Sequence, residues 1–444
     1  MKDVFKLLEK LNEKGFEAYI VGGCVRDYIL GIIPKDYDIT TNALPDEIAN
    51  VFKDYGILRH GEKYGTIGVG FENKFYEITT FRSEGSYNDN RHPGQVKFLN
   101  NLDDDLKRRD LTINAMAMDR FLKIYDPFGG KDDLKNKIIR SCGNANERIK
   151  EDALRILRAV RFANRFKFYI DEDLFDAISL NRDLLRNISK ERIFSEFSSM
   201  LLDERPSYAL RLMAESGVLK VLFPDLQKTV NYDQKTPYHD KTLFDHLICV
   251  MDNCPPKLHV RLAGLFHDIS KPDTFSFGED GRGHFFDHDL LGAKRAGEIL
   301  RDYRASNELI KKVEILIREH MKVHSEMTDK ALRRQIKRIG RENILDLYDL
   351  MYADCVCTRI DRDGSFILKR KNRILVLLDE RDMQKEKFLE INGNDLLALN
   401  FKGREIGQIL SDLEAEVLDN PSLNTREKLL EIVKNKYKSG DDIG

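Results

Sequence analysis

The sequence lacks any apolar run long enough to cross a membrane, and its charged first residues, MKDVFKLLEKLNEKGF, exclude a signal peptide. It also lacks an excess of one charge, because 73 basic residues stand against 75 acidic ones. Any nucleic-acid binding would therefore depend on a local basic patch. Low-complexity segments and repeats are absent too. The length predicts a protein of about two to four globular domains.

Cysteines are few, and they form no CxxC motif. The six are scattered along the chain: Cys24, Cys142, Cys249, Cys254, Cys355 and Cys357. Cys355 and Cys357 are separated by a single residue, which is too close for a CxxC redox or zinc motif. We therefore expect reduced thiols in a cytoplasmic protein.

The segment from Ala18 to Thr41, AYIVGGCVRDYILGIIPKDYDITT, carries the first pattern that indicates chemistry. Asp36 and Asp38 stand two positions apart in a predicted strand, so their side chains should project to the same side. Carboxylates that close repel each other unless a cation lies between them, and oxygen ligands suit Mg²⁺ or Mn²⁺. The preceding Gly-Gly can bring backbone N–H groups to an anion. Either pattern alone is common in turns and exposed strand ends; their order together indicates a nucleoside triphosphate site.

Hydrophobic periodicity divides the chain into a mixed part and a helical part. Residues 1–140 should contain a helix at 4–12, another at 46–52, and strands at 18–21, 36–40, 66–71, 75–81, 96–98 and 123–125. The polar stretch 82–93 is typical of a long loop. Strands should vanish after about 145, with helices at 147–165, 172–186, 189–203 and 206–217. The predicted class is α+β, with regions 1–140, 141–228, 229–375 and 376–444.

Seven motifs follow one another in a recognisable order. They are GGCVRD (22–27), DYD (36–38), EITTFR (77–82), RRDLTINA (108–115), DPFGG (126–130), EDALRILRAVRFA (151–163) and ERIFSEF (191–197). Over roughly the first 230 residues, this series resembles the class II tRNA nucleotidyltransferase and bacterial poly(A) polymerase family. The resemblance implies a mixed-sheet catalytic head similar to DNA polymerase beta, followed by a helical neck and body.

The resemblance also implies roles for residues near the head's acids. Asp36 and Asp38 match the pair that binds Mg²⁺ in the family, and Glu77 is either a third acid or an exposed strand glutamate. Gly22, Gly23 and Arg26 match the turn that binds the triphosphate. Asp27 is expected to brace Arg26 or to cap the helix.

Further nucleotide contacts are implied by the later motifs. Arg109, Asp110 and Asn114 are expected at the start of a helix, where the arginine meets phosphate or ribose oxygens. Asp152 and Arg155, three apart on a predicted helix, would share a face and read the edge of the incoming base. Arg158, one turn on, is a candidate phosphate contact. Glu191, Arg192 and Glu196 match a motif that mainly supports the neck.

Three specificities share this scaffold in the family, besides poly(A) synthesis: addition of CCA, of CC only, and of A only. The stretch around 82–93 is similar to the CCA-adding and A-adding members. The final forty residues have mixed charge and lack the basic tail usual in poly(A) polymerases. We expect CCA addition to the 3′ end of tRNA from CTP and ATP, with A addition as the alternative and poly(A) synthesis less favoured.

A third region, near 235–370, contains most of the histidines. LAGLFHDISKP has the form of the HD-superfamily signature, and its His267 and Asp268 are expected to bind a divalent transition metal with His246 and Asp354. The resemblance implies hydrolysis of a phosphate ester or cyclic phosphate, although HD folds also persist as inactive modules. His288 and His320 are expected to be ligands or phosphate contacts, and Lys271 a phosphate contact. Four others should be ordinary histidines: His239, His259, His284 and His324.

The RNA contacts are expected on the helical regions. Candidates are Arg161, Arg165, Lys167 and the basic run KALRRQIKRIGR (330–341). The expected partners are the tRNA 3′ end, ATP and CTP, with no membrane and no particular oligomeric state. A different class of protein, an RNA-binding protein with a degenerate head, is disfavoured by the intact acids and the Asp152 and Arg155 pattern.

Overall fold

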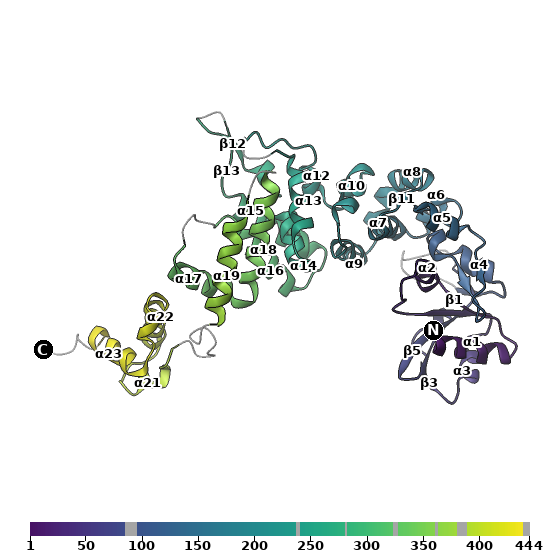
Figure 1. The fold of residues 1–444 in the computed structure, drawn as a ribbon, viewed down its shortest axis with the longest axis horizontal. Coiled ribbons are helices and arrows are strands. Elements are labelled where there is room, and N and C mark those ends of the chain that lie inside the picture. Colours follow the sequence, from purple (N-terminus) through teal and green to yellow (C-terminus); the bar gives the residue numbers. More distant parts are fainter. Residues whose placement is uncertain are drawn as a thin grey trace. The chain divides into compact units, whose positions relative to one another are not determined.

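The computed structural model describes residues 1–84, 96–236, 240–279, 282–322, 327–359, 363–379 and 389–437 (Figure 1). Its contacts form two compact units. The first comprises residues 1–232 with 298–306, and the second comprises 233–297 with 307–444. The first unit mixes strands and helices, and the second is mainly helical, as the α+β class predicts.

A mixed sheet forms the base of the first unit. Among the described residues its strand order is β3-β4-β5-β2-β1-β8-β9. β2 and β5 run parallel, whereas the other neighbours are antiparallel. The strands are β1 (Ala18–Val21), β2 (Asp38–Thr41), β3 (Gly56–Leu58), β4 (Thr66–Phe71), β5 (Lys74–Thr80), β8 (Ala117–Met118) and β9 (Ile124–Tyr125). A separate hairpin, β6 (Arg82–Glu84) and β7 (Val96–Phe98), flanks the polar stretch 85–95, which lies outside the described residues.

Short helices border this sheet. Helix α1 (Lys2–Glu13) buries Val4, Leu7, Leu8 and Leu11, which confirms the periodicity seen in the sequence. Helix α3 (Pro45–Val51) begins at its proline, which needs no hydrogen-bond partner for a missing N–H. The remaining helices of this part are α2 (Gly23–Ile29), η1 (Glu62–Tyr64), α4 (Leu102–Lys107), η2 (Thr112–Asn114) and α5 (Gly130–Asn136).

The helix expected at 147–165 is in fact two helices, α6 (Ala145–Glu151) and α7 (Leu154–Phe166). Asp152 between them has an extended backbone, with φ −144° and ψ 104°. Its side chain accepts a hydrogen bond from the Leu154 amide at 3.0 Å, a local bond with which aspartate competes against helix continuation. The elements that follow are α8 (Glu172–Asn181), η3 (Arg182–Asn187), α9 (Lys190–Leu201), α10 (Ser207–Glu215), α11 (Val218–Leu222) and α12 (Pro224–Gln227).

Strands do not vanish after 145, contrary to the sequence-based expectation. β11 (Tyr169–Ile170) pairs with β10 (Ile138–Ile139), and β12 (Phe275–Phe277) pairs with β13 (Gly283–Phe285). These strands have two or three residues each, too few for a period-two pattern to emerge. The helices of the second unit are α13 (Leu243–Asn253), α14 (Leu258–Phe266), η4 (Lys271–Asp273), α15 (His288–Asp302), α16 (Asn307–Glu319), α17 (Asp329–Ile339), α18 (Arg341–Thr358) and α19 (Ser365–Asp379).

The last described helices have their own apolar cluster. α21 (Gly393–Leu397), α22 (Arg404–Asp419), η5 (Pro421–Leu423) and α23 (Arg426–Tyr437) follow one another along the chain. Leu396, Leu413 and Leu429 are fully buried in this cluster. Within the described ranges, no helix is both long enough and apolar enough to span a bilayer.

The expectation that all thiols are reduced is wrong for one pair. Cys249 on α13 and Cys357 on α18 form a disulfide, because these two helices pack together and bring residues 108 positions apart into contact. Cys24, Cys142, Cys254 and Cys355 are buried free thiols.

A thiol count tests this pairing. In denaturant without reductant, four thiols per chain should react with an alkylating reagent, and all six should react after reduction. A Cys249→Ser chain should show five thiols in either state, because Cys357 is then unpaired. Six reactive thiols in the unreduced parent would contradict the disulfide.

Candidate functional site

The expected acids gather around one cavity of the first unit. A cavity of about 760 Å³ is lined by Asp36, Asp38 and Glu77, among others. Asp38 is the first residue of β2, and the parallel register places it opposite Glu77 on β5. Asp36 precedes the strand instead of belonging to it, so the expected strand start was wrong by two residues. The shared cavity therefore depends on the segment before β2 as well as on strand alternation.

Charge and burial both act on these acids. Desolvation and the neighbouring Asp36 carboxylate raise the pKa of Asp38, while the Arg109 guanidinium opposes that shift. The three acids supply only carboxylate oxygens, the donor set that suits Mg²⁺ or Mn²⁺. The site thus fits a divalent cation by the chemistry of its donors.

Gly22 brings the backbone close to the same acids. Its φ is +80°, and a Cβ there would lie 2.8 Å from Arg109 Nη1 and 3.8 Å from Asp38 Oδ2. Glycine is therefore needed at position 22, both for the positive φ and because a Cβ would collide with Arg109. The structure thus brings together the Gly-Gly turn, Arg109 and Asp38, as the sequence motifs indicated.

Arg26 lies beside the Gly-Gly turn, as a Cβ on Gly23 would be 3.3 Å from Arg26 Nη2, and internal partners hold its side chain there. Its side chain is 5% exposed and donates hydrogen bonds to Asn114 Oδ1 at 2.5 Å and to Asp27 Oδ1 at 2.7 Å. The guanidinium also lies 5.2 Å from the Phe162 ring centre and 4.8 Å from that of Phe166. Arg26 therefore ties α2 to η2 and to α7, and Asp27 braces it as expected.

Asp110 forms a second link between the segment around η2 and helix α7. Its carboxylate pairs with Arg158 Nε at 2.7 Å and accepts a hydrogen bond from Asn114 Nδ2 at 3.2 Å. Burial alone would raise the pKa of Asp110, but Arg158 and Asn114 outweigh it and lower that pKa. The helix expected to begin here is only the single 3₁₀ turn η2, so these residues lie in a connecting segment.

Asp152 and Arg155 do not share a helix face, contrary to the sequence interpretation. The break at Asp152 turns its carboxylate to Arg192, with Asp152 Oδ2 2.8 Å from Arg192 Nη2. Arg155 instead pairs with Glu151 at 2.7 Å and donates to the Arg148 carbonyl at 2.8 Å. The i,i+3 spacing predicts proximity only within an unbroken helix.

Two residues of this network were missed or ranked low by sequence reasoning. Arg148 donates to the carbonyls of Arg108 and Arg109, and Arg192 holds Asp152. The density of arginine between 148 and 165 was the available signal. The local sequence pattern does not predict contacts with partners 40 positions away.

The candidate RNA contacts of the neck are engaged in internal pairs. Arg161 Nε lies 2.6 Å from Glu196, and the exposed Lys167 lies 2.7 Å from Glu204. The basic run of α17 is likewise paired with acids of its own unit: Arg334 with Asp419 at 2.7 Å and Arg338 with Glu319 at 2.6 Å. Lys330 and Lys337 also pair with acids of α22. This pairing favours an intramolecular role for the basic run.

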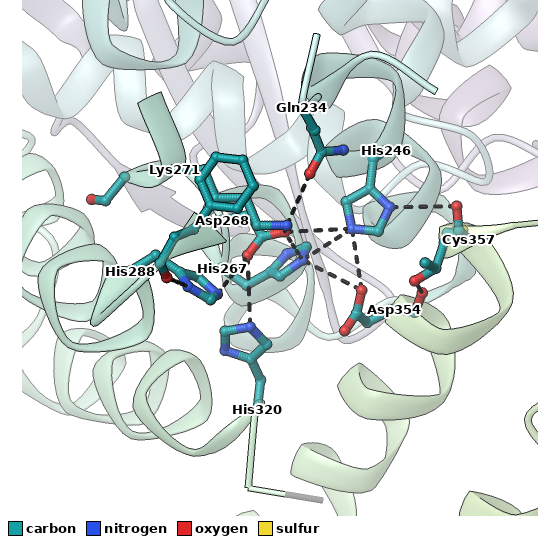
Figure 2. A network of polar contacts seen from close by, with 12 residues as sticks. Gln234, His246, His267, Asp268, Lys271, His288, His320, Asp354 and Cys357 are labelled. Carbon is teal, nitrogen blue, oxygen red and sulfur yellow. Dashed lines mark hydrogen bonds and ion pairs between the residues drawn. The ribbon is translucent and has the colours of Figure 1, made fainter. Parts of the chain in front are cut away.

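A compact histidine and aspartate cluster lies in the second unit (Figure 2). His246 comes from α13, His267 and Asp268 follow α14, and Asp354 comes from α18. His246 Nε2 lies 3.1 Å from Asp354 Oδ1 and 3.2 Å from His267 Nε2. His267 Nε2 lies 3.3 Å from Asp268 Oδ2 and 3.6 Å from Asp354 Oδ1. All four residues expected as metal ligands therefore converge.

Backbone carbonyls orient the two imidazoles of this cluster. His267 Nδ1 lies 2.9 Å from the Gly264 carbonyl oxygen, and His246 Nδ1 lies 3.4 Å from that of Cys357. Such bonds fix the ring so that Nε2 faces the cluster, as in metal-binding histidines. Two imidazole nitrogens and two carboxylates are a donor set that suits a divalent transition metal.

The other residues of this region divide as follows. Lys271 is buried, with Nζ 2.6 Å from Asp268 Oδ2 and 2.9 Å from Gln234 Oε1. His288 and His320 face Asp268 from the other side. His259 pairs instead with Asp346 at 2.6 Å, and His284 stacks on Phe286. His239 and His324 lie outside the described residues.

The cluster predicts an alkaline loss of stability in metal-free protein. Burial alone would lower the pKa of His267, but Asp268 and Asp354 outweigh it and raise that pKa from 6.5 to about 10. A group whose pKa is higher in the folded state than in the unfolded state stabilises the folded protein. This stabilisation is complete at a pH below the unfolded-state pKa and is lost as the pH rises through the folded-state pKa. The urea midpoint of EDTA-treated protein should therefore fall between about pH 7 and about pH 9.5.

His267→Gln is the comparison for that measurement. Its urea midpoint should change less over the same pH interval, because the group that titrates is gone. A parent whose midpoint is unchanged across the interval would contradict the raised pKa of His267.

Comparisons with known proteins cover nearly the whole chain. Residues 18–140 match the family model "Poly A polymerase head domain", 167–229 match "Probable RNA and SrmB- binding site of polymerase A", and 288–433 match "tRNA nucleotidyltransferase domain 2 putative". The CCA-adding enzyme of Ligilactobacillus salivarius (strain UCC118) is 35% identical over 437 residues, which are 98% of this chain and 96% of that protein.

Two further relatives support the same relationship. The CCA-adding enzyme of Lactobacillus delbrueckii subsp. bulgaricus (strain ATCC BAA-365 / Lb-18) is 44% identical over 257 residues, covering 56% of this chain and 63% of that protein. The crystal structure of the Bacillus stearothermophilus CCA-adding enzyme in complex with CTP superposes with a TM-score of 0.76 at 26% identity. That superposition covers 98% of each chain.

Proposed function

This chain belongs to the CCA-adding enzyme family of tRNA nucleotidyltransferases, and from that premise we propose that it adds CCA to the 3′ end of tRNA. The substrates are CTP and ATP, and pyrophosphate is released at each step. The carrying observation is the cavity that Asp36, Asp38 and Glu77 line beside Arg109. Full-length similarity to CCA-adding enzymes supports the choice of reaction. We place the protein in the cytoplasm.

Asp36 and Asp38 are the proposed catalytic ligands of Mg²⁺, with Glu77 as a third acid. Mg²⁺ supplies charge neutralisation at the triphosphate and activation of the primer's 3′-hydroxyl. Gly22 and Gly23 approach the triphosphate with backbone N–H groups, and Arg109 donates to its oxygens. Catalysis of this kind depends on positioning and electrostatics, with little covalent chemistry from the protein.

The neck, which we place at 141–228, is the proposed base reader. From the two sides of the helix break, the Asp152 carboxylate would accept hydrogen bonds from the incoming base and the Arg155 guanidinium would donate them. Arg158, Asp110 and Asn114 connect this reader to the head, and Arg26 braces the same junction. At this break Arg192 Nη2 donates a hydrogen bond to Asp152 Oδ2 and so orients the carboxylate.

An incorporation assay tests this function. The protein is incubated with labelled CTP or ATP, Mg²⁺, and tRNA that ends either at the discriminator base or in CC. The proposal expects C and then A to be added to the first tRNA, and A to the second. Addition of A alone, and only to the CC-ending tRNA, would select the A-adding alternative. No incorporation on either tRNA would overturn the enzyme assignment.

A second candidate function is favoured by the cluster in the second unit. We propose that 229–375 is an HD-type domain, followed by a tail at 376–444. In it His246, His267, Asp268 and Asp354 hold a divalent transition metal for hydrolysis of phosphate esters. The convergence of four ligands within hydrogen-bonding range supports it.

The test of the second function compares phosphodiesterase activity and metal content of the parent with those of His267→Ala. Loss of both, with CCA addition retained, is expected. Equal metal content and equal activity in the two chains would refute the HD site.

A further inference from the structure

Arg155, the proposed donor to the incoming base, is held by three acceptors. Its Nη1 atom donates to the Arg148 carbonyl at 2.8 Å and to Glu151 Oε2 at 2.7 Å. Its Nη2 atom donates to the Arg108 carbonyl at 3.1 Å. A guanidinium has five N–H groups, so in the described part of the chain these bonds leave one on Nε and one on Nη2. A bidentate contact with the edge of a base uses two donors.

Arg148 controls all three of these acceptors. The first is its own backbone carbonyl. The second, the Glu151 carboxylate, accepts a hydrogen bond from Arg148 Nη1. The third, the Arg108 carbonyl, accepts one from Arg148 Nη2, which also donates to the Arg109 carbonyl at 3.2 Å. Each group that fixes the Arg155 guanidinium is therefore supplied or held by one residue.

The helix break at Asp152 lies between the two arginines. Arg148 belongs to α6 and Arg155 to α7, and their side chains are only 13% and 10% exposed. Both side chains donate to the Arg108 carbonyl, although seven residues would span about 10 Å along an unbroken helix. The junction of the two helices thus places both guanidinium groups against the same peptide.

Like charges oppose this arrangement. Burial lowers the pKa of the Arg148 guanidinium, and the charge of Arg155 lowers it further, while Glu151 acts against that shift. Two buried guanidinium groups side by side cost free energy that an apolar side chain at position 148 would not cost. The hydrogen bonds that Arg148 donates therefore explain an arginine at this position better than packing does.

We propose that Arg148 is a positioning residue for base selection, which fixes the Arg155 guanidinium so that its two remaining N–H groups face the incoming base. This inference rests on the proposed function, in which Arg155 reads CTP and ATP. Arg148 acts through Arg155 and makes no contact with the nucleotide. A displacement of about 1 Å is enough to spoil such a contact, because a hydrogen bond weakens steeply with distance and angle.

The choice of base by Arg148→Met tests this proposal. With tRNA that ends at the discriminator base, kcat/KM is measured for CTP and for UTP, whose ring presents a different pattern of donors and acceptors. The preference for CTP should fall about tenfold, as expected for one misplaced contact to a base. KM for tRNA should stay at the parental value. Parental preference in this variant would overturn the proposal.

Two further variants serve as references. Arg148→Lys keeps the charge but can reach only one of the two acceptors that the arginine side chain holds, so it should recover part of the preference. Lys150→Met removes an exposed cation of the same helix and should select bases as the parent does. A circular dichroism spectrum of each chain confirms its fold.

A double-mutant comparison separates positioning from a general structural effect. In an Arg155→Ala chain, Arg148→Met should lower the preference for CTP no further, because the group that it positions is gone. Equal losses with and without Arg155→Ala would overturn the proposal. Parental preference in Arg155→Ala itself would refute the base reader and this inference with it.

Tripolyphosphate, which carries no base, distinguishes an effect through Arg155 from one through Arg109. Its inhibition constant should be the same for the parent and for Arg148→Met. An inhibition constant that rises as much as KM for CTP would overturn the proposal and assign the effect to Arg109, whose carbonyl Arg148 also holds. A parent that incorporates neither nucleotide would instead refute the proposed function.

Discussion

Replacing Asp36 and Asp38 together by asparagine should abolish nucleotide incorporation while leaving the protein folded. The two carboxylates share one cavity, and the asparagine amide keeps their shape but removes the charge that holds a divalent ion. Losing about 4 kcal/mol of transition-state stabilisation lowers the rate about a thousandfold. The measurement is single-turnover incorporation of labelled CMP into tRNA that ends at the discriminator base.

Stability should move in the opposite direction to activity in this variant. The pKa of Asp38 is raised by desolvation and by Asp36, which means that the charged pair is unfavourable in metal-free protein. Asparagine removes that repulsion.

Asp54→Asn, an exposed acid of the same unit, is the control for the activity measurement and should incorporate CMP at the parental rate. Parental incorporation by the double variant would refute the metal assignment.

Replacing Gly130 by alanine adds one methyl group, and we expect it to destabilise the first unit more than a methyl group added at any other glycine described there. A Cβ there would overlap the carbonyl oxygen of Thr112, lie 2.9 Å from its carbonyl carbon and 3.1 Å from Met116 Sδ. Two of these neighbours are backbone atoms of η2, which cannot move aside as a flexible side chain can. Overpacking of this kind costs about 3 kcal/mol.

The consequence should reach the catalytic region as well as stability. Asp126 fixes the turn before α5 by accepting from the Gly130 amide at 2.8 Å and the Lys131 amide at 2.9 Å, so α5 cannot easily retreat. The strain would fall on η2, whose Asn114 holds Arg26. The first thermal transition should drop by about 10 °C, since about 3 °C corresponds to each kcal/mol in a unit of this size.

Gly56→Ala is the matched control for that experiment. Gly56 lies in β3 of the same unit, and a Cβ there would have no heavy atom within 4 Å. Its stability should change by less than about 0.5 kcal/mol. Equal thermal midpoints for Gly130→Ala and Gly56→Ala would contradict the packing seen around η2.

Features that depend on local order could be predicted from the sequence. The 3.6-residue period of Val4, Leu7, Leu8 and Leu11 specified α1, and Pro45 marked the first turn of α3. The glycine pair, the two acids and the adjacent His267 and Asp268 indicated a triphosphate site and a metal site, because these patterns carry their chemistry within a few residues. The order of the motifs then identified the family.

Tertiary structure alone decided how these pieces are joined. Asp152 ends a helix that the periodicity would continue, because its own carboxylate accepts a hydrogen bond from the Leu154 amide. Arg26 donates a hydrogen bond to Asn114, 88 positions away, and Cys249 forms a disulfide with Cys357, 108 positions away. His288 and His320 meet on the second oxygen of Asp268 for the same reason. Spacing along the chain specifies only neighbours within one element, whereas packing between elements brings distant side chains together.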